Sequence, residues 1–168
     1  SPNAFVQEGH PIITPTGSQN LHQEVELGVV FGKTAKSPNA FVQEGHPIIT
    51  PTGSQNLHQE VELGVVFGKT AKAVTRSEAM SYIGGYIIED PHAEEIFCRI
   101  NGVEKQRSKT NAMIFDIPTL IEYLTRFVTM EEGDVLLTGT PAGVCRVLPG
   151  DCIEFGITNR ITCNFVVQ

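Results

Sequence analysis

The stretch LHQEVELGVVFGK, residues 57–69, decides the fold prediction, and an identical copy occupies residues 21–33. Side chains in an extended strand alternate between its two faces, so residues two positions apart point the same way. An extended strand therefore places His58, Glu60 and Glu62 on one face, while Leu57, Val61 and Leu63 take the other. The pattern predicts a β-strand with one apolar face and one acidic face.

The acidic face has two interpretations. Neighbouring carboxylates repel each other, and a cation or a proton between them relieves that repulsion. Ligand sets made only of oxygen suit hard ions such as Mg²⁺, Ca²⁺ or Mn²⁺. The alternative is an antiparallel strand whose carboxylates are solvated. His58 has the same two interpretations, because it could be a base or ligand beside the glutamates or a hydrogen-bonded surface residue. Spacing alone leaves both open.

The duplication extends beyond this strand, because residues 1–36 and 37–72 are identical. Structural repeats normally diverge, since each copy packs against different neighbours, and a stable stack usually needs at least three. The second copy continues directly into the unique sequence, so we expect it to occupy the native place. The first copy, residues 1–36, is then predicted to be surplus, either disordered or paired along an edge strand.

Composition excludes several classes of protein. The chain of 168 residues is 40% hydrophobic and 18% charged, with a formal net charge of −7, which argues against nucleic acid or an anionic membrane as partner. It has no apolar run long enough to span a membrane and no leader-like segment after Ser1. The four cysteines lack zinc-site spacing and are predicted to be small buried side chains in a reducing compartment.

Local patterns predict the elements that follow. Thr75 and Glu78 form a capping box, which predicts a short helix to Ser81. Residues 83–88 (IGGYII) read as a buried strand with glycines that permit close backbone approach, and residues 94–107 as a hairpin turning at Asn-Gly.

The clearest predicted helix begins after Asp116, a good N-cap, with Pro118 in its first turn. Its predicted apolar face contains Leu120, Ile121, Leu124, Phe127 and Val128. A short strand, residues 135–137, then leads into the loop Thr138-Gly139-Thr140-Pro141, and two more strands end the chain. Such a loop could hold a carboxylate or a phosphate, or it could simply be a turn. The overall prediction is a mostly β (α+β) fold with one or two helices.

These segments together resemble the fumarylacetoacetate hydrolase family. The motifs are NLHQEVELGVVFGK, YIGGY, INGVEKQ, MIFDIPTLIEYLTRFVTMEEGDVLLTGTPAGV and LPGDCIEFGI, and they cover nearly all of residues 37–168. The chain is most similar to small single-domain members with acylpyruvate hydrolase or oxaloacetate decarboxylase activity. The resemblance implies a rolled β-sheet around an acidic site for Mg²⁺ or Mn²⁺, a β-dicarbonyl acid substrate and a dimer.

The resemblance also implies roles for particular residues. The two glutamates of the family's E-x-E motif are metal ligands, which maps onto Glu60 and Glu62, with Glu24 and Glu26 as the duplicate set. The family's T-G-T-P loop binds substrate, which maps onto Thr140. No catalytic base is assigned, because the N-terminal family segment that carries the catalytic histidine is absent.

The chain departs from the family pattern in a second place. The family's third metal ligand, an aspartate in D-x-T-x-R-D, and a substrate-binding lysine after it are missing, which predicts an internal deletion near residues 88–89. Asp90 is close by count, but its context matches the turn before the Asn-Gly hairpin. Two carboxylates without a third ligand would hold a hard ion weakly. The resulting expectations are a metal-dependent hydrolase or decarboxylase of doubtful activity, or an inactive truncated product that only folds or dimerises with an intact paralogue. The family resemblance implies a mitochondrial or cytoplasmic location.

Overall fold

The computed structural model describes residues 27–29, 42, 44–84 and 90–168. Their elements, in chain order, are β1 (Leu27–Val29), β2 (Leu57–Gln59), β3 (Val61–Val66), the 3₁₀ turn η2 (Ala79–Tyr82), β4 (Glu95–Ile100), β5 (Val103–Lys109), the 3₁₀ turn η3 (Thr110–Ala112), α1 (Ile117–Phe127), β6 (Val135–Leu137), β7 (Cys145–Val147), β8 (Cys152–Ile157) and β9 (Ile161–Val166). The predicted mostly β fold is confirmed.

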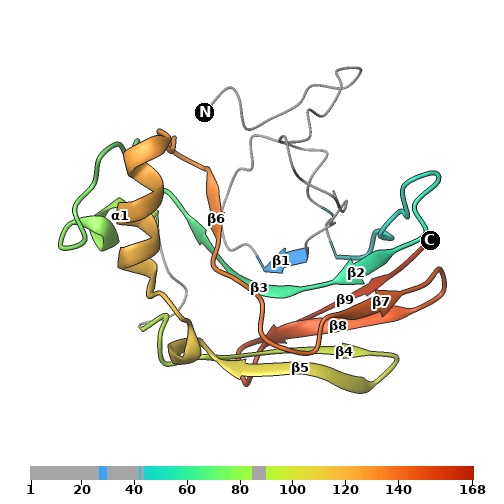
Figure 1. The fold of residues 1–168 in the computed structure, drawn as a ribbon. Coiled ribbons are helices and arrows are strands. Elements are labelled where there is room, and N and C mark those ends of the chain that lie inside the picture. The colour runs from blue at the N-terminus through green and yellow to red at the C-terminus, as the bar shows by residue number, and fades with distance from the viewer. Residues whose placement is uncertain (1–26, 30–41, 43, 85–89) are drawn as a thin grey trace, which may run out of the picture.

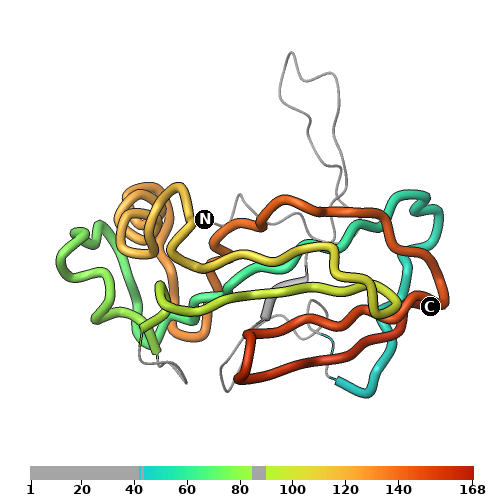
Figure 2. The backbone as a smooth tube through the Cα atoms, turned by 90° about the horizontal axis from the view of Figure 1, so that it is seen from below, coloured from blue at the N-terminus to red at the C-terminus, as the bar shows by residue number. Residues whose placement is uncertain are grey.

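The strands form three sheets, with orders β1-β3-β6, β2-β7 and β5-β4-β8-β9. The largest sheet is antiparallel throughout. In Figure 1 it lies below β2 and β3, and α1 stands at one end beside β6. Figure 2 shows the same layers from below, with the β4–β5 and β8–β9 hairpins extending side by side. This layered arrangement leaves one face of β3 directed away from the large sheet.

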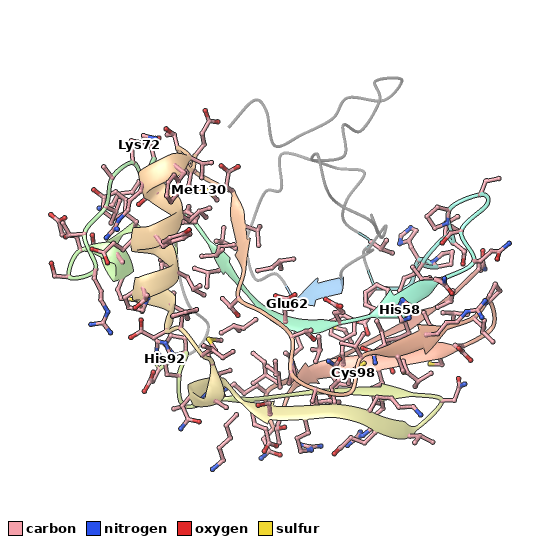
Figure 3. The ribbon with its side chains drawn as sticks, in the orientation of Figure 1. His58, Glu62, Lys72, His92, Cys98 and Met130 are labelled. Carbon is pink, nitrogen blue, oxygen red and sulfur yellow. The ribbon has the colours of Figure 1, made fainter. Side chains whose placement is uncertain are left out.

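The core lies between β2–β3 and the four-stranded sheet. Val61 and Leu63 from β3 are 2% and 3% exposed, and they belong to one buried cluster with Cys98 and Ile153 from the sheet. Figure 3 shows Glu62 on one side of β3 and Cys98 on the other. Full burial of a large apolar side chain stabilises the fold by about 1.5–3 kcal/mol. The predicted alternation along residues 57–63 therefore sets which face of the strand is buried in the core.

Helix α1 begins as the sequence predicts. The Asp116 side chain accepts a hydrogen bond from the Thr119 N–H at 2.9 Å, and proline occupies the first turn. The predicted apolar face is wrong in part, because the side chains that α1 buries are Ile117, Ile121 and Thr125. Phe127 is instead 66% exposed and contacts the ring of Tyr123 edge to face. The helix packs through a narrow stripe of side chains, and Phe127 at its end lies outside that stripe.

The helix predicted at residues 75–81 is wrong in its first half, because residues 76–78 form a turn and the helical part is the 3₁₀ element η2. The Thr75 hydroxyl donates to the Glu78 carboxylate at 2.6 Å, so the two side chains bond to each other. The segment is a turn followed by η2, whose N-terminal residue receives no side-chain cap. In the described part of the chain α1 is the one α-helix, and the second predicted helix is a turn followed by η2.

The predicted Asn-Gly turn and the predicted close backbone approach at Gly84 are confirmed. Asn101 and Gly102 have φ values of 52° and 78°, as the β4–β5 hairpin requires. Gly84 lies backbone to backbone against Gly68, and a Cβ on Gly84 would lie 2.8 Å from the Gly68 Cα. Of the strand predicted over residues 83–88, only Ile83 and Gly84 lie within the described residues, and Ile83 forms a bridge with Phe67.

A segment of the first copy pairs with the second. Strand β1 lies parallel to β3, with Leu27 opposite Val61 and Val29 opposite Leu63. Leu27 corresponds to Leu63 in the second copy, so the identical strands pair with a shift of two residues. The duplicate glutamates Glu24 and Glu26 lie outside the described residues.

The cysteine prediction holds for one residue only. Cys98 is buried, and burial raises the pKa of its thiol to about 12. Cys145 and Cys163 are half-buried, and Cys152 is exposed on the first residue of β8. All four are free thiols.

Among the described residues, no helix combines the length and the apolar character needed to cross a membrane.

Candidate functional site

The acidic strand and the T-G-T-P loop meet in the structure. Glu62 is 4% exposed, and its carboxylate accepts a hydrogen bond from the Gly139 N–H. The interpretation of a solvated acidic face therefore does not hold for Glu62. Glu60 lies in the short break between β2 and β3 and is half-buried. Two segments that are 77 residues apart in sequence thus meet at one carboxylate.

Side chains extend the β3 ladder beyond the end of β6. The backbone pairing of these strands covers Gly64 to Val66 of β3 and ends at Leu137. Immediately afterwards the Thr138 hydroxyl donates to the Leu63 carbonyl at 2.8 Å, and the Thr140 hydroxyl donates to the Val61 carbonyl at 3.0 Å. The two threonines of the loop therefore take over as hydrogen-bond donors to β3, and Gly139 lies between them. The loop therefore uses a hydroxyl side chain at each alternate position, Thr138 and Thr140.

Gln106, on β5, connects the same strand and loop. Its side-chain oxygen accepts from the Val61 N–H at 3.0 Å, and its amide nitrogen donates to the Thr140 hydroxyl and the Pro141 carbonyl, at 2.8 and 2.7 Å. Gln106 is 1% exposed on a strand whose other side chains are exposed or half-buried. Sequence reasoning missed this residue, because a single glutamine in VEKQRSK carries no pattern that separates it from its polar neighbours.

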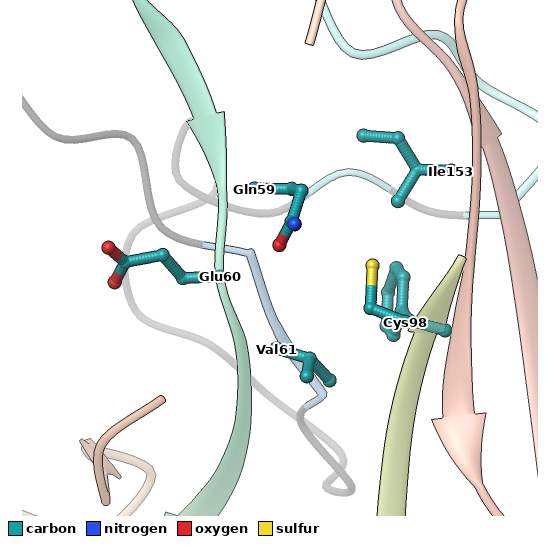
Figure 4. A pocket seen from close by; sticks show the side chains of 6 residues that line it. Gln59, Glu60, Val61, Cys98 and Ile153 are labelled. Carbon is teal, nitrogen blue, oxygen red and sulfur yellow. The ribbon is translucent and has the colours of Figure 1, made fainter. Parts of the chain in front are cut away.

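Gln59 fastens the far end of the loop. Its amide nitrogen donates to the Gly143 carbonyl at 3.1 Å and to the Cys145 sulfur at 3.3 Å. Figure 4 shows Gln59 directed toward Cys98 and Ile153, on the opposite side of the strand from Glu60. The Gln59 side chain is 1% exposed, and within the described residues its amide oxygen has no hydrogen-bond partner. The signal in the sequence was a polar residue in register with Leu57 and Val61 on the apolar face.

Thr140, the predicted substrate contact, lies in this network. A hydroxyl has one proton and two lone pairs. Its proton is directed at the Val61 carbonyl, and one lone pair accepts from Gln106. The hydroxyl could therefore meet a substrate only as an acceptor unless the loop changes. His58, on β2, is half-buried and lies opposite Arg146 of β7.

A group of charged residues lies on β5, at the edge of the large sheet. Lys105, Arg107 and Lys109 are exposed. Arg107 forms ion pairs with Glu95 and Glu104 and lies over the ring of Phe97, 5.5 Å from its centroid. These contacts belong to the surface of β4 and β5.

The carboxylates fit a hard divalent ion in their chemistry. Mg²⁺ keeps several waters and is commonly held by one or two carboxylates. A carboxylate offers about four acceptor positions, so the hydrogen bond from Gly139 is compatible with an ion at Glu62. Among the described residues there is no cluster of three or more histidine, cysteine, aspartate or glutamate side chains that could hold a metal. Asp90, the nearest aspartate by count, is exposed and accepts from the His92 N–H at 2.9 Å within a turn.

A cavity of about 260 Å³ lies beside the loop. Thr138, Gly139, Thr140 and Pro141 form one wall. The remaining lining is mostly apolar and includes Ile96, Met113, Phe115 and Leu120, with Lys109 among the polar residues.

A rolled, mostly antiparallel sheet with a buried glutamate against a T-G-T-P loop defines the class of fold to which the resemblance pointed. The family profile described as "Fumarylacetoacetate (FAA) hydrolase C-terminal" matches residues 34–89 and 87–168. The chain belongs to the fumarylacetoacetate hydrolase family. The two matched segments meet at residues 87–89, beside the predicted deletion, and residues 85–89 lie outside the described part of the chain.

Two relatives extend the match over most of the chain. The mitochondrial oxaloacetate tautomerase fahd-1 of Caenorhabditis elegans is 45% identical over 99% of this chain and 80% of its own length. The mitochondrial oxaloacetate decarboxylase of Dictyostelium discoideum is 33% identical over 94% of this chain and 75% of its own length.

Solved structures share the fold. A putative fumarylpyruvate hydrolase from Burkholderia cenocepacia has a TM-score of 0.67 and 26% identity, covering 72% of both chains. A maleylpyruvate hydrolase from Sphingobium sp. SYK-6, solved with manganese(II) and pyruvate, has a TM-score of 0.67 and 24% identity, covering 72% of this chain and 58% of its own. These likenesses confirm the rolled-sheet fold.

Proposed function

We propose that the chain binds Mg²⁺ or Mn²⁺ through Glu60 and Glu62 and acts on small β-dicarbonyl acids. The reactions are those of its relatives and family, namely oxaloacetate decarboxylation or tautomerisation, or acylpyruvate hydrolysis. The observation that carries this proposal is the buried Glu62 carboxylate against Gly139 of the loop. A buried carboxylate is costly unless it is paired, hydrogen-bonded or bound to a cation. The manganese complex of the Sphingobium enzyme supports the choice of ion.

The chemistry of such substrates determines what each group would do. A bound divalent cation would stabilise the negative charge that develops on the substrate's oxygens as an enolate forms. Thr138 and Thr140 hold the loop against β3, so the loop backbone presents a fixed surface beside the carboxylates. The imidazole of His58 lies on the same strand face by alternation, and one of its nitrogens could accept a proton from the carbon between two carbonyl groups.

The absent family segments limit this activity. Within residues 37–168 the sequence has no counterpart of the family's third-ligand motif. We therefore expect weak metal binding and low turnover, with a dimer formed by two copies of the chain or with an intact paralogue. Of the two expected locations, mitochondrial and cytoplasmic, the mitochondrial relatives favour the first.

Metal binding and activity can be tested separately on the full chain. Calorimetric titration with Mn²⁺ is expected to show binding that is lost when Glu60→Gln and Glu62→Gln are combined. The absorbance of enol-oxaloacetate is expected to decay faster with the wild type plus Mn²⁺ than with the double variant. Glu132→Gln, an exposed carboxylate in a turn, is the matched control and should bind as the wild type does. Wild-type protein that binds no Mn²⁺ would contradict the proposal and favour the inactive truncated product.

A further inference from the structure

Gln106 is a buried polar residue on an otherwise exposed strand. The other side chains of β5 are exposed or half-buried, whereas Gln106 is 1% exposed and reaches β3 and the loop. A buried amide is retained without a large cost only when its donors and acceptor are satisfied. All three Gln106 hydrogen bonds are made at the contact between β3 and the T-G-T-P loop, one to β3 and two to the loop.

The direction of each hydrogen bond in this contact is fixed. The Val61 N–H can only donate, so the atom opposite it is the oxygen of the Gln106 amide. The Pro141 carbonyl can only accept, so the amide nitrogen faces the loop and also donates to Thr140. The Val61 carbonyl can only accept, so the Thr140 hydroxyl donates to it. Neither a flipped amide nor a rotated hydroxyl satisfies the same partners.

This closed set of hydrogen bonds determines where Gly139 lies. Thr140 is held by Gln106 on one side and by Val61 on the other, and Gly139 is its neighbour in the chain. A hydrogen bond depends on distance and angle together and weakens steeply below an angle of about 120°, so a displacement of the loop at Thr140 alters the contact between Gly139 and Glu62.

We propose that Gln106 is a positioning residue of the candidate metal site. It fixes Thr140 and Pro141 so that the Gly139 N–H reaches the Glu62 carboxylate and sets the orientation of that carboxylate. The link to metal binding rests on the proposed function, whereas the link to Gly139 does not. Groups that orient a metal ligand through a hydrogen bond change metal affinity by about ten- to a hundredfold when they are removed.

The test uses the Gly139 amide as a spectroscopic signature in the full chain. Gln106→Met keeps the length of the side chain and removes its hydrogen bonds. The amide proton of Gly139 is expected to move upfield, toward its position in Glu62→Leu, and the affinity for Mn²⁺ is expected to fall by about ten- to a hundredfold. Gln59→Met is the matched control, because Gln59 is an equally buried glutamine that contacts the loop only at Gly143 and Cys145.

The outcomes separate the two proposals. A Gly139 amide unchanged in Gln106→Met, or changed equally in Gln59→Met, would overturn the positioning role. Failure of the wild type to bind Mn²⁺ would contradict the proposed function, while the amide comparison would still decide the role of Gln106. Where Gln106→Met does not fold, the pair Thr140→Val and Thr140→Ser provides the same comparison. The valine variant is expected to shift the Gly139 amide, and the serine variant, which keeps the hydroxyl, is expected to retain it.

Discussion

The backbone of Gly143 lies directly against Lys105, because a Cβ on Gly143 would be 1.9 Å from the Lys105 carbonyl oxygen. Gly143 also has a φ of 109°, a conformation that other residues rarely adopt. The loop that begins at Thr138 therefore contacts β5 closely at Gly143, near the end of the loop. Glycine is required there for two independent reasons, the space and the backbone conformation.

Gly143→Ala should therefore lower the free energy of unfolding by more than the cost of the φ value alone. We expect a loss of about 2–3 kcal/mol in urea denaturation, since strained backbone costs about 1–3 kcal/mol and the steric contact adds to it. Gly53→Ala is the matched control, because Gly53 has a φ of 83° and nothing within 4 Å of its Cβ position. Equal losses in the two variants would show that the contact with Lys105 is not restrictive.

Glu62→Gln should separate charge from hydrogen bonding at the site. The amide oxygen can still accept from the Gly139 N–H, so the melting temperature should change little, whereas the anionic ligand is lost. Removing a group that only hydrogen-bonds to a metal ligand lowers metal affinity by up to about a hundredfold. Loss of the ligand charge itself should lower the affinity for Mn²⁺ by at least about that factor. Calorimetry and thermal unfolding on the same sample measure both effects. A large fall in melting temperature with unchanged Mn²⁺ binding would mean that Glu62 is structural only.

Glu95 should contribute acid-sensitive stability. Hydrogen bonds from Thr158 and Arg107 hold the pKa of Glu95 below its ordinary value of 4.5. A carboxyl whose pKa is lowered by folding stabilises the protein above the unfolded-state pKa, and this contribution is lost as the pH falls through the folded-state pKa. The melting temperature of the wild type should exceed that of Glu95→Gln at neutral pH, and the difference should shrink below pH 4.5. A difference that does not depend on pH would contradict this assignment.

The four thiols should differ in reactivity. Cys98 is buried with a pKa of about 12, so almost none of it is thiolate at neutral pH, whereas Cys152 is exposed. Brief treatment of the native chain with iodoacetamide followed by peptide mapping should label Cys152 first. Cys98 should be labelled only after unfolding in urea. Early labelling of Cys98 would show that the core opens at this position under native conditions.

Deletion of residues 1–36 should expose the edge of β3. Strand β1 pairs with β3 from Val61 to Leu63, and an edge strand with open hydrogen-bonding groups tends to pair with other chains. We expect the deleted protein to self-associate more than the full chain in sedimentation velocity. Gly28→Pro, which removes a backbone N–H within β1, should act in the same direction. Identical sedimentation of all three proteins would mean that β1 does not protect this edge.

The sequence by itself determined the local elements and the family. Strict alternation along residues 57–63, the Asn-Gly turn and the Asp116 cap are each set by neighbouring residues, and they were predicted correctly. The family followed from the order of its motifs. Local rules failed at Phe127 and at Thr75. The burial of Phe127 depends on which elements pack against the helix, and the Thr75 hydroxyl donates to the Glu78 carboxylate.

Only the tertiary structure decided how the candidate site is built. Glu62 is buried because a loop 77 residues further on supplies an N–H to its carboxylate. Gln106 lies among polar residues in the sequence, and Gln59 lies in a strand with buried apolar residues. Both are buried, because the amide of each donates to a backbone carbonyl of a distant loop. Such contacts depend on where separate strands cross, and hydrogen bonds require distance and angle together. The sequence indicated which residues to consider as metal ligands, and the fold shows that one of them, Glu62, is buried against the loop.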